Sequence, residues 1–220
     1  MKTFNKSTLI NSGLDFIHTL CNFIVLNLVF LITSLPIITI GASVSALYYV
    51  MIKEAKQEFG YLVRPYLKEF KNNFKATTFS FLLFFFTGII LLFNLAFWYA
   101  MDNLVSMLII SVLIFASICY LFTFLYAFPL MARFENGIVQ TLKNAFYLSL
   151  LHKKITFALL FVDAFVISLC VFFSPMKLFM TLFGFAFIAY CKSFLFIQVF
   201  DYYETSQLTK DKGVGCQKVL

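Results

Sequence analysis

Charged residues are scarce in this chain of 220 residues, of which only 12% are Asp, Glu, Lys or Arg. Soluble domains carry about twice that share. Hydrophobic residues instead make up 62% of the chain, and its mean hydropathy is +0.92. This composition argues against a soluble globular fold and indicates a chain that turns most of its apolar surface toward lipid. The length leaves no room for a separate soluble domain.

The sequence also lacks the motifs that mark most enzymes. There is no Walker motif, GxSxG, HExxH or pair of catalytic carboxylates. Its five cysteines form no CxxC or Cys/His pairing, and Cys21, Cys119, Cys170 and Cys191 lie inside apolar runs, where small buried residues are expected. We therefore expect no enzymatic activity, no cofactor and no metal site.

Long apolar runs dominate what is present. The first covers residues 17–52 and is broken once, at Ser34–Ser43, where Pro36 lacks an N–H and disfavours helix at the preceding residue. We expect a spanning helix before the break. The segment after the break is either a short span or a re-entrant element, because only about 16 residues remain for it.

Two further hairpins are predicted at 76–130, with a polar turn at 102–103, and at 155–200, with a turn at 174–175. The predicted fold is therefore all-α: a polytopic transmembrane helical bundle of about six spans, or four spans plus a re-entrant hairpin. It forms a single transmembrane domain, residues 1–204, followed by a polar cytoplasmic tail, residues 205–220.

The net charge of +7 follows the segments between the apolar runs. Lys and Arg gather in 53–75 and 133–154, so the positive-inside rule places these segments and both termini in the cytoplasm. Basic residues placed beside apolar runs indicate contact with anionic lipid headgroups rather than binding of nucleic acid. Within 53–75, apolar residues recur every four positions, which predicts an amphipathic surface helix. A cytoplasmic docking surface is expected at the basic residues Arg64, Lys68, Lys71, Lys75 and Lys143.

A few polar residues inside the apolar runs are candidates for substrate or partner contacts. Asp163 and Lys192 fall at similar depth in their hairpin. They could form an ion relay or contact a substrate, or they could be a structural ion pair or include a lysine that snorkels to the interface.

The broken segment, with Pro36, Gly41 and Ser43, could form a binding site or a packed turn. Asn27 and Asn94 could form hydrogen bonds between helices or line a pore.

Several blocks together carry a family resemblance: NLVF at 27–30, SLPIITIGAS at 34–43, ALYYVM at 46–51, FKNNFK at 70–75, YAFPL at 126–130 and RFEN at 133–136. This order resembles the YesL-like family of Gram-positive bacterial membrane proteins, over most of the chain. Members tend to be encoded beside carbohydrate ABC importers and glycan-degrading enzymes, and the family supplies no catalytic residues.

The resemblance implies a multi-pass protein of the bacterial cell membrane. As a non-enzymatic accessory subunit it would stabilise or modulate an ABC sugar permease, with the lipid bilayer, permease subunits and possibly their ATPase as partners. Two alternatives remain open: a small solute transporter or channel, and a membrane-bound regulator or assembly factor for sugar uptake.

Overall fold

The computed structural model describes the backbone of residues 6–58, 61–101, 103–134 and 137–216, and the side chains of residues 19–58, 61–101, 103–134 and 137–202. Helices account for all regular structure in these ranges, which confirms the all-α fold. In chain order they are α1 (Lys6–Ser34), the 3₁₀ turn η1 (Ile37–Thr39), α2 (Ile40–Ala55), α3 (Val63–Asn72), α4 (Phe74–Tyr99), α5 (Leu104–Arg133), α6 (Ile138–Leu151), α7 (Lys153–Phe172), α8 (Ser174–Phe179), the π-helical turn η2 (Met180–Gly184) and α9 (Phe185–Cys216).

Five helical stretches within the described residues are long and apolar enough to cross a membrane: Ile37–Ala55, Phe74–Tyr99, Leu104–Arg133, Lys153–Phe172 and Ser174–Tyr202. A sixth apolar stretch, Thr19–Ser34, is shorter. The chain is therefore a multi-pass membrane protein. The segment after the break has 19 residues, or about 28 Å of helix, close to the thickness of the hydrocarbon core.

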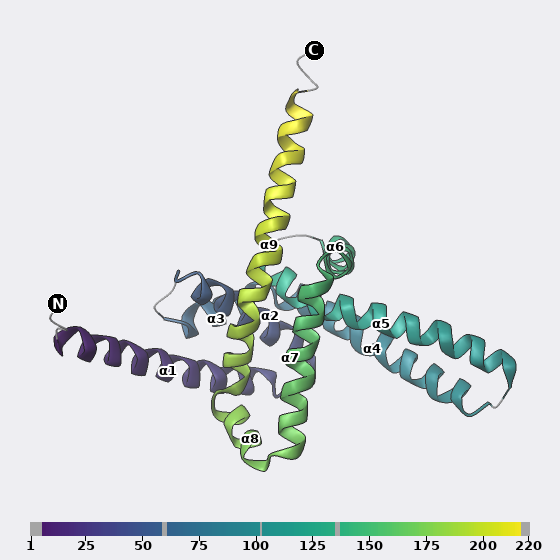
Figure 1. Cartoon of the computed structure of the whole chain (residues 1–220), viewed down its shortest axis with the longest axis horizontal. Coiled ribbons are helices and arrows are strands. Elements are labelled where there is room, and N and C mark those ends of the chain that lie inside the picture. The colour runs from purple at the N-terminus through teal and green to yellow at the C-terminus, as the bar shows by residue number, and fades with distance from the viewer. Residues whose placement is uncertain (1–5, 59–60, 102, 135–136, 217–220) are drawn as a thin grey trace.

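Helix α2 is the centre of the molecule, and the other long helices radiate from it (Figure 1). Half of the residues in its apolar window are buried inside the protein, against 6% in α5 and 11% in α4 and α7. Figure 1 shows α1 leaving to one side, the α4–α5 hairpin to the other, and α7 to α9 running across both. The hairpins splay from a shared base instead of forming a parallel bundle.

The chain break lies beside the base of the α4–α5 hairpin. A Cβ on Gly41, just after the break, would lie 2.5 Å from the Phe81 Cβ and 2.6 Å from the Thr77 carbonyl oxygen, both in α4, and 3.1 Å from the Phe128 ring in α5. Thr77 is in the first turn of α4 and Phe128 is near the end of α5. The break thus lies beside the end of this hairpin at which α4 begins and α5 ends.

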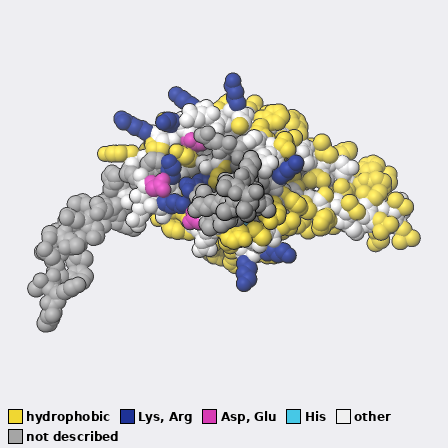
Figure 2. Space-filling view, turned by 90° about the horizontal axis from the view of Figure 1, so that it is seen from above, with side chains coloured by type: hydrophobic (Ala, Val, Ile, Leu, Met, Phe, Trp, Pro, Cys, Tyr) yellow, Lys and Arg dark blue, Asp and Glu magenta, His cyan; other side chains and the backbone are white. Residues whose placement is uncertain are grey.

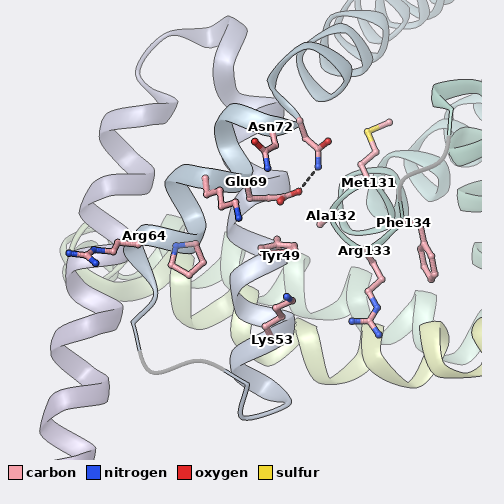
Figure 3. Close-up of a pocket in the computed structure, with 12 residues that line it drawn as sticks. Tyr49, Lys53, Arg64, Glu69, Asn72, Met131, Ala132, Arg133 and Phe134 are labelled. Carbon is pink, nitrogen blue, oxygen red and sulfur yellow. Dashed lines mark hydrogen bonds between the residues drawn. The ribbon is translucent and has the colours of Figure 1, made fainter.

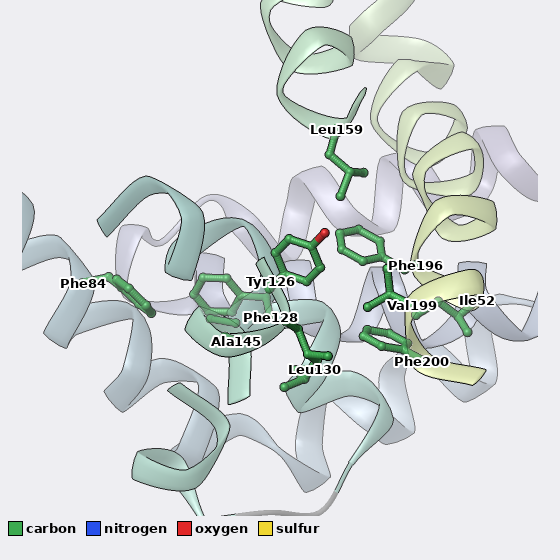
Figure 4. Close-up of a cluster of buried hydrophobic side chains, with 12 residues drawn as sticks. Ile52, Phe84, Tyr126, Phe128, Leu130, Ala145, Leu159, Phe196, Val199 and Phe200 are labelled. Atoms are coloured by element: carbon green, nitrogen blue, oxygen red, sulfur yellow. The ribbon is translucent and has the colours of Figure 1, made fainter. Parts of the chain in front are cut away.

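Two clusters of buried side chains hold the base together. One joins residues of α2, α4, α5, α6, α7 and α9 (Figure 4). At its centre the Phe196 ring meets Tyr126 and Tyr48 edge to face, each at 5.5 Å between centroids. The other cluster joins α1, α2, α3 and the start of α9 around Leu26, Met51 and Tyr66. Because lipid tails are as apolar as these side chains, close packing and polar contacts stabilise such clusters more than water exclusion does.

The surface helix predicted within 53–75 exists as α3, with one difference, and the basic segment 133–154 contains α6. Helix α3 ends at Asn72, so Lys75 lies in the first turn of α4 and not on the surface helix. The basic stripe is therefore interrupted at Asn73. Residues 205–216 of the predicted tail continue α9, and the lysines at positions 2, 6, 210, 212 and 218 lie outside the described side chains.

The prediction that the four cysteines in apolar runs are buried is wrong for two of them. Cys21 and Cys191 are exposed, whereas Cys119 and Cys170 are partly buried. Both exposed residues lie on helices whose outer faces are apolar, so lipid can cover a small thiol there as well as a protein core can.

Candidate functional site

Asp163 of α7 and Lys192 of α9 form an ion pair between the Lys192 Nζ and the Asp163 Oδ1. Lys192 is buried, while the Asp163 side chain is 38% exposed. Removing a lone ammonium from solvent is costly, so the carboxylate partner stabilises Lys192 at this depth. The structure thus joins the two charges that the sequence placed at similar depth.

Two cavities flank this pair. One, of about 280 Å³, extends toward Phe30 and Met180, and the other, of about 550 Å³, extends toward Gly41 and Phe128. Both are lined by Asp163, Lys192 and Tyr48, so the pair divides one apolar groove beneath α7 into two parts. Helix α7, whose residues line both cavities, is mostly unburied.

Asn27 of α1 binds the irregular turn η2. Its Nδ2 donates to the carbonyl oxygens of Met180 (3.3 Å) and Thr181 (2.8 Å), and its Oδ1 accepts from the Ala186 N–H at 3.0 Å. A π-helical turn interrupts the regular ladder of backbone hydrogen bonds. Asn27 is fully buried and satisfies polar groups of that turn, so it connects helices rather than lining an open path.

The break itself is a turn closed by hydroxyl groups. The Thr39 Oγ1 donates to the carbonyl oxygens of Thr33 (2.6 Å) and Pro36 (2.7 Å), and the Ser43 Oγ donates to the Thr39 oxygen at 3.0 Å. Pro36 lies exposed between exposed apolar residues, and Ser43 is buried. The Thr39 hydroxyl thus supplies a hydrogen-bond donor to two carbonyl oxygens at the irregular turn.

A third cavity, of about 540 Å³, lies at the basic end of the base, between the C-terminal ends of α2 and α5 and one face of α3 (Figure 3). Its lining includes the cationic residues Lys53, Arg64, Lys68 and Arg133 and one carboxylate, Glu69. The Glu69 Oε1 accepts a hydrogen bond from the Asn73 Nδ2. We call this cavity the basic pocket.

Helix α3 is fixed against α1 and α2 by Tyr66. Its side chain is fully buried, and its hydroxyl forms a hydrogen bond with the Thr33 hydroxyl. Burial raises the pKa of the Tyr66 phenol above its usual value, although hydrogen bonds with Thr33 and Ser43 act in the opposite direction. The phenol is therefore neutral across the physiological range, and one wall of the basic pocket is held in place.

The remaining predicted site residues do not converge on either place. Asn94 donates only to the Ile90 carbonyl oxygen of its own helix, at 2.8 Å. Lys71, Lys75 and Lys143 are exposed and lie outside the lining of the basic pocket, which only Arg64 and Lys68 of the predicted docking surface reach.

Sequence reasoning missed Lys53 and Arg133, which end two of the apolar helices, and it missed η2. The signal for the two cations was their position: each sits in the last turn of a span. Nothing in the sequence around Met180–Gly184 marks a π-helical turn.

Fold and site together define a multi-pass α-helical membrane protein with an ion pair and a groove at membrane depth and a basic pocket at one end. A family model described as "Protein of unknown function, DUF624" matches residues 23–95. That family consists of uncharacterised membrane-associated proteins. The matched third of the chain runs from α1 to α4 and contains the break and α3. No curated protein and no solved structure matches the chain.

Proposed function

We propose that this protein is a non-enzymatic accessory subunit that binds the permease of a carbohydrate ABC importer within the bacterial cell membrane, with both its termini in the cytoplasm. The resemblance to the YesL-like family supplies the class of partner. The structural support comes from the α4–α5 hairpin, whose long helices of 26 and 30 residues are held only at their base.

This hairpin offers an extended apolar surface for a partner. Side chains such as Phe93, Leu108 and Phe115 are each about 70% exposed, and the hairpin leans away from α7 and α9 (Figure 1). Seen from above, it forms the apolar projection at the right of Figure 2, while Lys and Arg side chains surround the base. Two helices packed only on each other leave most of their surface to lipid or to another membrane protein.

Site-specific photocrosslinking tests the proposal. A benzophenone amino acid at Phe93 or Phe115 should form adducts with sugar-permease subunits in native membranes, whereas the same probe at buried Phe84 should not. A probe at Phe161, equally exposed but on α7, shows whether contact is specific to the hairpin. Adducts with lipid alone, together with purification of the protein free of any permease or ATPase in mild detergent, would contradict the proposal.

A small solute carrier is the second candidate, and the groove beneath α7 favours it. Polar or charged groups facing a cavity at membrane depth are the usual elements of a transport path. The purified protein in proteoliposomes should then take up a sugar, and Asp163→Asn should abolish that uptake. A regulator or assembly factor would differ from both in binding its partner only transiently.

A further inference from the structure

The basic pocket differs from an ordinary positively charged surface because it is concave and assembled from three separate helices. Residues of α2, α3 and the end of α5 each contribute to its lining. Two of its cations, Lys53 and Arg133, are partly buried, whereas Lys71 and Lys143 elsewhere on this end are exposed. A lysine or arginine that only fixes the orientation of the protein in the membrane does not need a partly buried side chain.

The described residues that line the pocket carry four cationic groups and one carboxylate. Lys53 places its Nζ 4.7 Å from the centroid of the Tyr49 ring, which orients the ammonium at the pocket wall. Figure 3 shows Lys53 and Arg133 on the same side of Tyr49 and Glu69, and Arg64 pointing outward. Lys53 and Arg133 are therefore the cations we assign to the interior, while Lys68, which also lines the pocket, is exposed.

Among the described lining residues the four cations outnumber this one carboxylate. Glu69 accepts a hydrogen bond from the Asn73 amide, and the amide of Asn72 adds a further polar group to the same wall. Lysine supplies a point charge and arginine a planar pair of donors, a combination that suits phosphate oxygens.

The volume and the walls limit the size of the ligand. About 540 Å³ exceeds what one phosphate group fills and is within the range of small-molecule sites. Pro65, Met131 and Phe134 add apolar surface beside the cations. Such a mixed lining fits a phosphate group attached to a small organic moiety.

We propose that the basic pocket binds a phosphate-bearing anion, with Lys53, Lys68 and Arg133 contacting the phosphate oxygens. The phosphate belongs either to the headgroup of an anionic lipid or to a soluble phosphate ester, since both present the same chemistry. The proposal does not depend on an ABC importer as partner, and it stands if the crosslinking experiment fails.

The experiment uses the full-length protein and two probes. In detergent, titration with inorganic pyrophosphate by calorimetry reports binding of a soluble phosphate. In nanodiscs with and without phosphatidic acid, native mass spectrometry reports a retained lipid. Saturable pyrophosphate binding assigns a soluble ligand, retention of phosphatidic acid alone assigns a headgroup, and absence of both overturns the proposal.

Variants with matched charge distinguish the pocket from general attraction. Lys53→Gln combined with Arg133→Gln should weaken binding at least about tenfold, while Lys71→Gln combined with Lys143→Gln, which removes the same charge outside the pocket, should change it less than about twofold. Equal losses in both would show that only net charge matters and would refute the site. If the first variant does not fold, Lys68→Gln alone should weaken binding about threefold or more, and an unchanged affinity would refute the site.

Discussion

Asn27 and Thr181 are 154 positions apart in the chain, yet the Asn27 Nδ2 donates to the Thr181 carbonyl oxygen at 2.8 Å. This contact ties the first apolar helix to the one irregular turn of the last hairpin that the described residues contain. It gives a buried asparagine a structural role between helices, which is the usual role of such a residue in a span.

Replacing Asn27 with leucine should destabilise the protein by about 1–3 kcal/mol, because backbone groups of η2 and α9 would lose their partner in a buried place. Thermal unfolding in detergent measures the effect. Asn94→Leu is the matched control: its amide bonds only its own helix, so stability should be unchanged or slightly raised. Equal effects for the two variants would contradict the role of Asn27.

Replacing one member of the Asp163–Lys192 pair should lower the free energy of unfolding far more than replacing both members. Asp163→Leu leaves a buried ammonium without its partner and should cost about 3–5 kcal/mol, while the double variant with Lys192→Met should recover most of that loss. A double-mutant cycle by thermal unfolding provides the measurement.

The Lys56–Asp201 pair serves as the comparison for that cycle. Its charges are 3.0 Å apart but more exposed, with 24% and 54% of the two side chains accessible. Its disruption should cost less than about 1 kcal/mol. If Asp163→Leu alone also lowered the free energy of unfolding by less than about 1 kcal/mol, Lys192 would have to reach solvent or lipid headgroups without its partner.

Gly41→Ala should loosen the base of the α4–α5 hairpin. The added methyl group would meet the Phe81 Cβ at 2.5 Å and the Thr77 oxygen at 2.6 Å, so α2 and α4 must separate at a cost of about 1–3 kcal/mol. Gly137→Ala has no atom within 4 Å of the new methyl and should cost less than about 1 kcal/mol through the N-cap preference alone. Equal stabilities would contradict the close approach.

Stability should fall as the solution becomes acidic through His152. Burial lowers the pKa of this imidazole below its usual value. Its Nε2 has no hydrogen-bond partner among the residues that the structure describes, and its ring packs edge to face on Tyr202 at 5.0 Å between centroids. The unfolded chain therefore binds a proton more readily, so stability decreases as the pH drops below about 6.5. His152→Gln should flatten this part of the pH profile, and an unchanged profile would assign it to another group.

The sequence predicted the elements that follow from local physics and missed those that depend on contacts between distant segments. Proline at position 36 predicted the break, and the four-residue recurrence around Tyr66 predicted α3. The place of the break beside the α4–α5 hairpin could not be predicted, because it depends on how closely Gly41 approaches Thr77 and Phe81.

The same distinction applies to the candidate sites. Similar depth brought Asp163 and Lys192 into consideration as a pair, and the structure joins them. The basic pocket could not be found in this way, because α2, α3 and α5 supply its residues from positions 49 to 134, and no single stretch of sequence contains the pattern.

The position of the break has a consequence for how the chain enters the membrane. Its tip consists of apolar and hydroxyl-bearing residues, with Leu35 78%, Ile37 62% and Ile38 55% exposed. Because 34–43 contains no charged residue, the first helical pair carries no ionised side chain in its turn when it enters the membrane. The energetic cost of inserting this end of the protein is then that of moving apolar and hydroxyl-bearing residues into lipid, with no charge to desolvate at the tip.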